Sequence, residues 1–306
     1  MVKADKRHNK YCGEIFGYPP SNKSKEAQYF RKNLICPFRD NDIKCDPDNK
    51  ISNLTDENGN RLVGNQTGAC MAWHNPSWSD DPYPVIICPN RFFENNIIFK
   101  FIKKKFFDNK KIIVTGGIGI RPFGTVDGLI GEVIERRDLH LIGKIAHIEY
   151  QSDATTGTRG LVESVRDFND GVDITMKDYN YGLNSKASIK GSSLQIIDKG
   201  YLFEELKIPS IWILQDYLFN YLRRIYNFDI NDITSELLLQ NEYLYFLTTT
   251  LNYNEEKDKF FLNIGRCYAS SPSKMQASIK KLHSIKKIDL VNGIIRSAKR
   301  GSAFII

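Results

Sequence analysis

The stretch HIEYQ, residues 147–151, ends an apolar segment with an acid and an amide separated by one residue. Successive side chains of a β-strand point to opposite faces, so Glu149 and Gln151 share one face and Tyr150 points to the other. Polar residues at a period of two are also typical of the solvent side of a half-buried strand. The pair alone therefore indicates either a solvated strand face or a site that uses a carboxylate and an amide together.

A second carboxylate upstream of Glu149 favours a functional site over a solvated strand face. Asp127 lies in the glycine-containing segment TVDGLIGEVIE, and ERRDLHL separates this segment from HIEYQ. If the chain forms a hairpin there, Asp127 and Glu149 come from neighbouring strands and can share a divalent cation. Two carboxylates and a backbone carbonyl suit Mg²⁺, which activates water and neutralises charge on a scissile phosphate. Gln151 would orient that water by hydrogen bonds, although it carries no positive charge.

Other acids stand close enough to compete with Asp127. Asp138 is nearer to Glu149 in the sequence, but it follows two arginines in a predicted turn, where aspartate is common. Glu132 shares the strand of Asp127 at an odd offset, which places it on the opposite face unless a bulge intervenes. Glu135 is also near. The residues by themselves leave open whether Asp138 or Glu132 takes part.

Four of the six cysteines form a second candidate centre. Their spacing is wider than the CxxC pairs of a typical zinc ribbon, so spacing alone is a weak signal. Two of them stand in the similar contexts ICPF and ICPN, where an apolar segment meets a turn. Four thiolates suit a tetrahedral zinc or iron site, and the alternative is a set of buried thiols in a core. The four residues are Cys36, Cys45, Cys70 and Cys88.

Other residues and the overall composition limit the class of protein and its expected compartment. We expect Cys12 and Cys267 to be free thiols and treat His74 as a possible substitute ligand. The first residues contain no apolar signal sequence and no apolar run reaches membrane-spanning length, so we expect a cytoplasmic protein with no membrane contact. Lys and Arg total 43 against 36 Asp and Glu, a formal net charge of +7. This mild excess permits a nucleic-acid partner without requiring one.

The secondary structure predicted around these residues divides the chain into two parts. Residues 1–105 are rich in turns and cysteines, with a helix capped by Ser21 or Ser24, a buried strand at 85–88, and a lysine-rich helix beginning near Arg91. Residues 106–306 alternate strands and helices and end in a basic helical segment whose prediction starts at Ser273. We expect an N-terminal metal-binding module that contacts DNA, followed by an α/β (α+β) catalytic core with a mixed central sheet flanked by helices.

Several blocks, taken in order, resemble the NotI-like restriction endonucleases. They are EIFGYP near residues 14–19, CPF at 36–38, Cys45, GAC at 68–70, ICPNR at 87–91, TVDGLIGEVIE at 125–135 and IEYQSDATTG at 148–157. No single block is specific, whereas their order, with four cysteines followed by D…ExQ, is quite specific. The blocks cover about residues 10–160, and the C-terminal half matches only loosely.

The resemblance implies a fold, a reaction and roles for residues. It implies a PD-(D/E)xK restriction-endonuclease-like core and a Type II site-specific deoxyribonuclease that cuts palindromic double-stranded DNA as a homodimer with Mg²⁺. By position, the catalytic residues are Asp127, Glu149 and Gln151, and the separation of the two acids favours Asp127 over Asp138. A structural metal, iron in the family and either iron or zinc here, would lie on the four cysteines. A cognate DNA methyltransferase in the host is implied as well.

The resemblance leaves other points open. The family has a further acid upstream of the first aspartate, and no counterpart stands between Lys111 and Thr125. The resemblance does not identify the residues that would read DNA bases. Arg91 and the following lysines are candidates because the metal module would brace their loop. The alternatives are a catalytically inactive, metal-stabilised DNA-binding protein and a less specific repair-type nuclease of the same superfamily.

Overall fold

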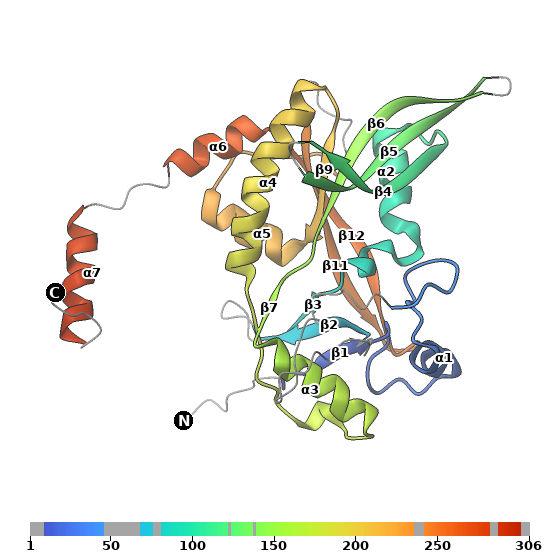
Figure 1. The fold of residues 1–306 in the computed structure, drawn as a ribbon, viewed down its shortest axis with the longest axis vertical. Helices are drawn as coiled ribbons and strands as arrows, with labels where there is room; N and C mark the ends of the chain where they lie inside the picture. Colours follow the sequence, from blue (N-terminus) through green and yellow to red (C-terminus); the bar gives the residue numbers. More distant parts are fainter. Residues whose placement is uncertain are drawn as a thin grey trace.

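The computed structural model describes residues 9–45, 68–75, 81–121, 124–136, 139–235, 242–281 and 287–300. Its centre is a seven-stranded sheet. The strands are β4 (Ile112–Ile120), β5 (Gly124–Arg136), β6 (Leu139–Gln151), β9 (Ser210–Gln215), β10 (Asn231–Asp232), β11 (Leu244–Asn254) and β12 (Lys259–Ser270). They lie in the order β10-β12-β11-β9-β6-β5-β4 (Figure 1). The sheet is mixed, because β9 pairs in parallel with both β6 and β11 while the other pairs are antiparallel.

The expected hairpin between the two acids is present. β5 and β6 pair antiparallel with Gly128 opposite Ile148, so the next opposed residues are Asp127 and Glu149. On its other side β6 pairs with β9, whose residues are all buried. The apolar run SIWIL suits a central strand of this kind, which is covered on both faces.

Different helices cover the two faces of the sheet. Trp212 and Leu214 of β9 pack with residues of α4 (Ser185–Glu205) and α5 (Asp216–Tyr226). Ile211 and Ile213 point the other way and pack with α2 (Ile97–Phe106). The alternation of strand side chains thus places α4 and α2 on opposite sides of β6 (Figure 1). The prediction of a mixed sheet flanked by helices is confirmed.

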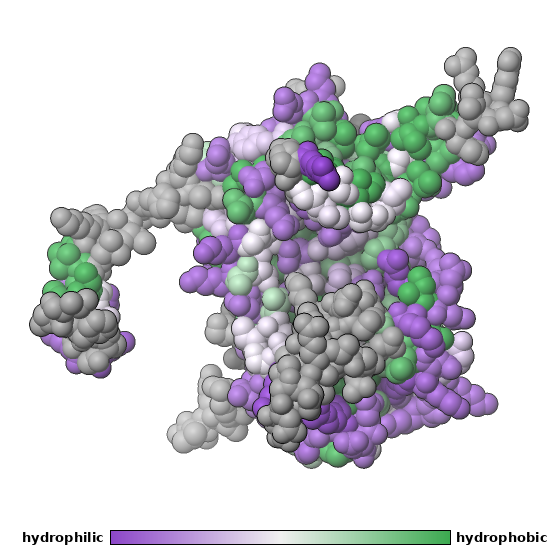
Figure 2. Space-filling view, viewed as in Figure 1, coloured by the Kyte–Doolittle hydropathy of each residue, from purple (hydrophilic) through white to green (hydrophobic). Residues whose placement is uncertain are grey.

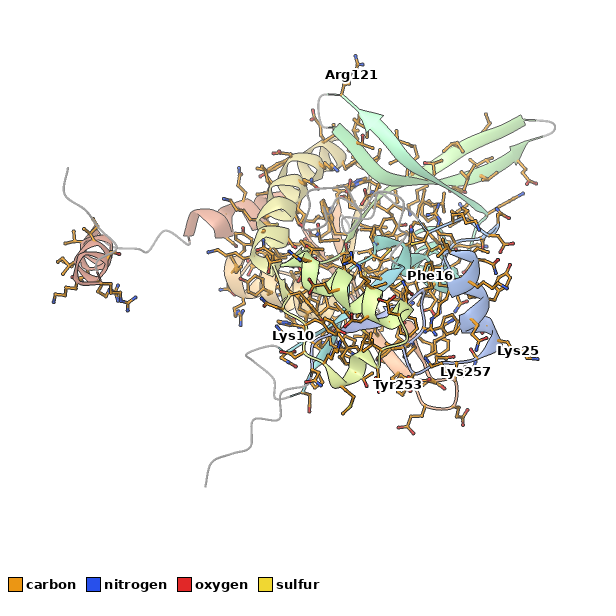
Figure 3. The ribbon with its side chains drawn as sticks, turned by 60° about the horizontal axis from the view of Figure 1, so that its bottom comes forward. Lys10, Phe16, Lys25, Arg121, Tyr253 and Lys257 are labelled. Carbon is orange, nitrogen blue, oxygen red and sulfur yellow. The ribbon has the colours of Figure 1, made fainter. Side chains whose placement is uncertain are left out.

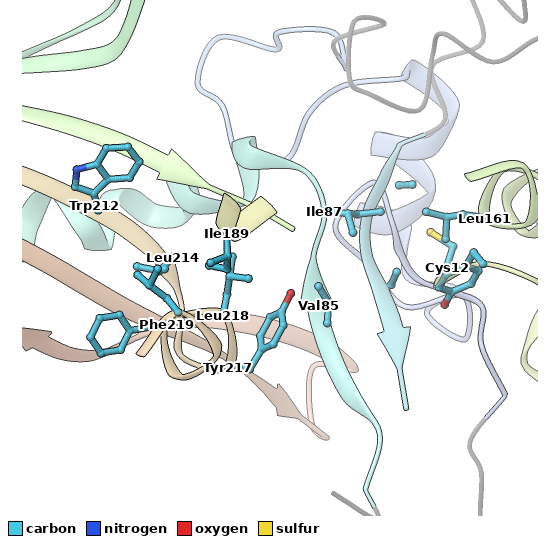
Figure 4. Packing of buried hydrophobic residues seen from close by; sticks show 14 of the residues in the cluster. Cys12, Val85, Ile87, Leu161, Ile189, Trp212, Leu214, Tyr217, Leu218 and Phe219 are labelled. Atoms are coloured by element: carbon cyan, nitrogen blue, oxygen red, sulfur yellow. The ribbon is translucent and has the colours of Figure 1, made fainter. Parts of the chain in front are cut away.

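The cysteine-rich residues build a smaller sheet. It consists of β1 (Cys12–Ile15), β2 (Ala69–His74) and β3 (Tyr83–Ile86), with α1 (Lys25–Asn33) and the 3-10 segment η1 (Pro89–Asn96) beside it. Ser24 caps α1 as predicted, since its side chain accepts a hydrogen bond from the Ala27 amide. Cys12 and Val85 of this sheet belong to the same buried cluster as Trp212 of the large sheet (Figure 4).

Helices and short strands complete the chain. They are β7 (Thr155–Thr156), α3 (Thr158–Asn169), η2 (Ile174–Met176), β8 (Gly182–Leu183), α6 (Pro272–Lys281) and α7 (Lys287–Lys299). Within the described residues no helix is long and apolar enough to cross a membrane.

Two predicted helices differ from the observed ones. The helix expected from Arg91 onward is divided, because Asn95 and Asn96 adopt left-handed φ values of 51° and 55° between η1 and α2. Asp216 follows the apolar run SIWILQ, and aspartate is a preferred N-cap residue, but here it is the first residue of α5. Gln215 precedes it as the cap, and the Asp216 carboxylate accepts a hydrogen bond from the Tyr217 amide.

The hairpin of β5 and β6 extends beyond the body of the molecule next to β4 (Figure 1). Apolar side chains gather on this part of the surface (Figure 2). The exposed ones are Ile113, Val114, Ile134, Leu141 and Ile142. Arg121, just after β4, lies at the top of the view in Figure 3, away from the protruding end of the hairpin, and Lys25, Tyr253 and Lys257 lie in its lower part.

Candidate functional site

The end of β6 presents its polar side chains as predicted. Glu149 and Gln151 face α4, where Gln151 Oε1 accepts a hydrogen bond of 2.5 Å from Ser192 Oγ and Glu149 contacts Lys199. Tyr150 points to the other face and packs against the aromatic rings of η1. The acid and the amide therefore face α4 rather than open solvent.

Asp127 and Glu149 meet across the hairpin. The Asp127 amide donates to Glu149 Oε1 at 3.4 Å, and the Tyr150 amide donates to Asp127 Oδ2 at 2.8 Å. Glu149 is buried, with 4% of its surface exposed, whereas Asp127 is exposed. The predicted trio of Asp127, Glu149 and Gln151 thus lies at one end of two adjacent strands, with one acid fixed in the protein and one open to solvent.

Three donors converge on one oxygen of Glu149. Its Oε1 lies 2.5 Å from Lys199 Nζ, 3.0 Å from His147 Nε2 and 3.4 Å from the Asp127 amide. Among the described residues no group donates a hydrogen bond to Glu149 Oε2 or to Asp127 Oδ1. Each carboxylate therefore has one oxygen that no hydrogen-bond donor of the described residues occupies.

His147 acts as a neutral support for Glu149. An ionised carboxylate only accepts hydrogen bonds, so His147 Nε2 carries the proton and Nδ1 accepts from Ser210 Oγ at 2.9 Å. The imidazole also stacks on Phe203 at 4.1 Å between ring centres. Burial lowers the pKa of His147, and the hydrogen bond to Glu149 only partly opposes this effect.

The two acids have opposite pKa shifts. Lost hydration and the negative charge of Glu149 raise the pKa of Asp127, although a hydrogen bond from the Tyr150 amide opposes the change. Burial would raise the pKa of Glu149 as well, but the hydrogen bonds from His147 and Lys199 outweigh it and hold this pKa below its usual value. Glu149 is thus the more firmly ionised member of a repelling pair, and a cation beside both would relieve that repulsion.

The donor set of this centre fits Mg²⁺ in part. Asp127 Oδ1 and Glu149 Oε2 are hard oxygen ligands, and Mg²⁺ in proteins commonly keeps water and takes substrate phosphate oxygens besides one or two carboxylates. In the part of the chain that the structure describes, no three His, Cys, Asp or Glu side chains converge to hold a metal ion. Backbone, water and substrate would therefore have to supply the remaining ligands.

The competing acids lie elsewhere. The pairing of β5 with β6 does shift register between Gly131 and Val133, but the extra residue lies in β6, where Gly143 and Lys144 stand opposite Glu132. Glu132 pairs with Lys110 at 2.8 Å, and Glu135 pairs with Lys111. Both are engaged in ion pairs near the far end of the hairpin. Asp138 lies outside the described residues.

All four predicted cysteine ligands are buried in the small N-terminal part. Cys36 and Cys70 share a buried cluster, and the Cys88 amide donates to the Cys70 carbonyl at 3.3 Å. Burial raises the pKa of Cys70, and the negative charges of Cys88, Cys45 and Cys36 add to this. The thiols are thus near enough to act on one another, but they do not form a metal-holding group among the described residues. The four-cysteine metal centre stays a prediction.

The other predicted thiols and the possible substitute ligand lie apart from this cluster. Cys12 contacts the backbone oxygens of Glu14 and Met71, and Cys267 is buried in β12. His74 lines a separate cavity with Asn75 and residues of α4 and α5.

The prediction that Arg91 reads DNA bases is wrong. Arg91 has no exposed surface and pairs with Glu14 at 3.0 Å and Glu94 at 2.6 Å. It also donates to the Phe260 carbonyl and lies under the ring of Phe38. Two carboxylates in an apolar interior require a paired cation, and the planar guanidinium group satisfies both. Arg91 therefore joins β1, η1 and β12 instead of reaching a partner.

A groove of about 950 Å³ opens beside Asp127 and Gln151. Its walls come from residues 38–43, from η1 and α2, and from β4. Arg39, Lys100 and Lys103 line it, and the Arg39 guanidinium lies 4.4 Å from the ring centre of Phe93. Positive side chains thus stand along a groove that leads to the exposed acid.

Sequence reasoning missed Lys199, although α4 contains a signal for it. Lys199 falls between Ile196 and Phe203 in the buried stripe of the helix, where a charged residue needs a partner. His147 carried a simpler signal, since it lies two residues before Glu149 on the same face of the strand.

Comparison with known proteins adds no assignment to these observations. A scan against models of known protein families finds no match, and a search of curated proteins finds no similar sequence.

Proposed function

We propose that this protein is a Mg²⁺-dependent Type II restriction endonuclease with a PD-(D/E)xK-like core. The observation that carries the proposal is the meeting of Asp127 and Glu149 on adjacent strands, with one unused oxygen on each carboxylate and with Gln151 beside them. Bound Mg²⁺ would supply an activated water and positive charge at the scissile phosphate. Glu149 would hold the ion from its fixed position, and Asp127 would hold it from the solvent side.

In this proposal Gln151 orients the attacking water. Its Oε1 accepts from Ser192 and its Nε2 donates to the Ser152 carbonyl at 2.7 Å, which fixes the amide plane. The second Nε2 hydrogen and the second lone pair of Oε1 then also have fixed directions, because both lie in the amide plane. In the reaction the water oxygen bonds to phosphorus and the bond to the leaving sugar oxygen breaks. Because an amide is a poor base, a phosphate oxygen or bulk water takes the proton.

The groove and its cations support a DNA substrate. Arg39, Lys100 and Lys103 would contact phosphates, which position a duplex without reading its sequence. The exposed apolar side chains along β4, β5 and β6 support self-association, since contiguous apolar surface of this kind marks interaction sites. We include in the proposal a homodimer on a palindromic site and a host methyltransferase that protects the same sequence.

The test is cleavage of unmethylated bacteriophage DNA by the purified protein with Mg²⁺, with EDTA as a control. We expect discrete bands that EDTA abolishes, and sequencing of the fragment ends gives the site. Glu149→Ala should lower the cleavage rate at least about 10³-fold while DNA binding is retained, because phosphate contacts supply most of the affinity. A smear would favour a repair-type nuclease, and intact DNA on several templates would favour a DNA-binding protein without activity.

A further inference from the structure

Lys199 is a buried cation whose role the predicted trio does not explain. Only 5% of its surface is exposed, although lysine is almost never buried without a partner. Its Nζ donates to Glu149 Oε1 at 2.5 Å and to the Thr125 carbonyl at 3.0 Å. The two acceptors belong to the strands that carry the two acids, so the ammonium group lies within the candidate centre.

One donor of this ammonium group is unused. Lysine has three N–H groups, and two of them are directed to Glu149 and Thr125. Among the described residues the third has no acceptor. The positive charge of Lys199 acts on Asp127 as well as on Glu149. The ammonium group and its third donor thus belong to the same centre as the two acids.

Helix α4 provides a positive charge that the polar end of β6 does not have. The third polar position of the strand is Gln151, which is neutral, so the sheet presents two carboxylates and no cation. Ser192, which holds Gln151, and Lys199 are seven residues apart and share one face of the helix. One helix face therefore fixes the amide and delivers the positive charge to the same end of the hairpin.

We propose that Lys199 is a catalytic residue of the nuclease centre, whose third N–H binds a non-bridging oxygen of the scissile phosphate. This inference rests on the proposed function. As the water oxygen bonds to phosphorus and the leaving sugar oxygen departs, negative charge grows on the non-bridging oxygens. Lys199 stabilises that charge through its N–H, and bulk water protonates the leaving oxygen. Removal of one preorganised donor of this kind costs about 10²–10³ in rate.

The experiment compares Lys199→Met with Lys199→Arg and with Lys190→Met, an exposed lysine of the same helix. Single-turnover cleavage is measured with Mg²⁺ on a DNA that the wild-type protein cuts. DNA affinity is measured with Ca²⁺, and occupancy of the acid pair is followed by Tb³⁺ luminescence. Melting temperatures establish that each variant is folded. Lys199→Arg, which keeps the charge, serves as a second variant where the methionine variant melts early.

We expect Lys199→Met to lose at least about 100-fold in cleavage rate and Lys199→Arg to recover part of it, while Lys190→Met cuts as the wild-type protein does. DNA affinity should change less than about threefold, and Tb³⁺ should bind Lys199→Met at least as tightly, because a positive charge has been removed. A Lys199→Met variant that cuts within about threefold of wild type would overturn the role of Lys199 alone. Loss of Tb³⁺ binding would show that Lys199 acts only by supporting Glu149. A wild-type protein that cuts no DNA would overturn the proposed function, and the role of Lys199 with it.

Discussion

At the scale of single residues, the two carboxylate oxygens of Glu149 have different surroundings. Oε1 of Glu149 receives its donors from β5, β6 and α4, whereas Oε2 receives none from the described residues. A carboxylate held in this way cannot rotate toward solvent without leaving a buried lysine unpaired, which costs several kcal/mol. The orientation of Glu149 is thus set before any ligand arrives.

His147 makes the stability of the protein depend on pH. Burial lowers the pKa of His147 below its ordinary value of 6.5, so the folded state binds fewer protons than the unfolded state between those two values. The contribution of neutral His147 to the free energy of unfolding should therefore be fully present above pH 6.5. It should decrease as the pH drops below 6.5, by up to about 1.4 kcal/mol per pH unit. Burial lowers the pKa of His74 as well, with the same sign.

Urea denaturation at pH 7.5 and pH 5.5 measures this dependence. His147→Asn should lose less stability than the wild-type protein between the two values, because one of the two described histidines with a lowered pKa is gone. His74→Asn provides the comparison for the other group. An equal loss in His147→Asn and wild type would contradict a neutral, buried His147.

The sequence was informative about some residues and not about others. Asp127, Glu149 and Gln151 could be placed together because a hairpin and a period of two depend only on local pattern. Arg91 and Lys199 could not be assigned, because each has a carboxylate partner far away in the sequence, Glu14 for Arg91 and Glu149 for Lys199. A buried guanidinium or ammonium group looks the same in a sequence as a solvated one.

At the scale of elements, close packing of β4 on β5 fixes Asp127. The residue after it, Gly128, has no room for a side chain, since a Cβ there would lie 2.5 Å from the Thr115 carbonyl oxygen and 3.0 Å from an Ile148 methyl group. The glycine thus allows the two strands to approach closely beside the exposed acid.

Gly128→Ala should reduce the free energy of unfolding by about 1–3 kcal/mol, because a backbone atom must move to admit the methyl group. Gly119→Ala in β4 is the matched control, since its Cβ would meet nothing within 4 Å, and its change should stay within about 0.5 kcal/mol. Thermal or urea denaturation of the two variants provides the measurement. Equal effects of the two substitutions would show that the contact between β4 and β5 is not tight.

The presence of elements was easier to predict than their boundaries or their order in the sheet. Alternation indicated the strand that ends in HIEYQ, which is β6, and an apolar run indicated the strand at 85–88, which overlaps β3, because these signals act over a few residues. The parallel pairing of β9 with β6 and with β11 joins distant segments, and no local signal reports it. The break between η1 and α2 depends on two asparagines with positive φ, which the amphipathic pattern does not reveal.

At the scale of the whole molecule, the Arg91 cluster joins the cysteine-rich part to the large sheet. Its partners come from β1, η1 and β12. Two of the four cysteines adjoin the elements of this cluster, because Cys88 precedes η1 directly and Cys70 lies in β2. A metal on these thiols would therefore add to the stability of the whole fold rather than to that of a loop alone.

Metal analysis of the purified protein should return one iron or zinc per chain. Cys70→Ser should lose most of that metal and melt at a lower temperature, because a tetrahedral thiolate site loses one of four ligands. Cys267→Ser is the matched control: it replaces an equally buried thiol in β12, and its metal content should be unchanged. A wild-type protein without bound metal, or equal metal loss in both variants, would mean that the four cysteines are ordinary buried thiols.

The parallel pairing of β6 with β9 has a consequence for synthesis. A ribosome releases Asp127 and Glu149 before it has made Lys199, and Ser210, which fixes His147, follows that histidine by 63 positions. At translation rates of about 5–20 residues per second, the growing chain carries the two acids for about 3–12 s before their supports exist. A nascent chain or a fragment that ends before α4 would thus hold both acids without an assembled centre. If the protein is the nuclease proposed above, the centre would be complete only in chains that extend beyond Ser210.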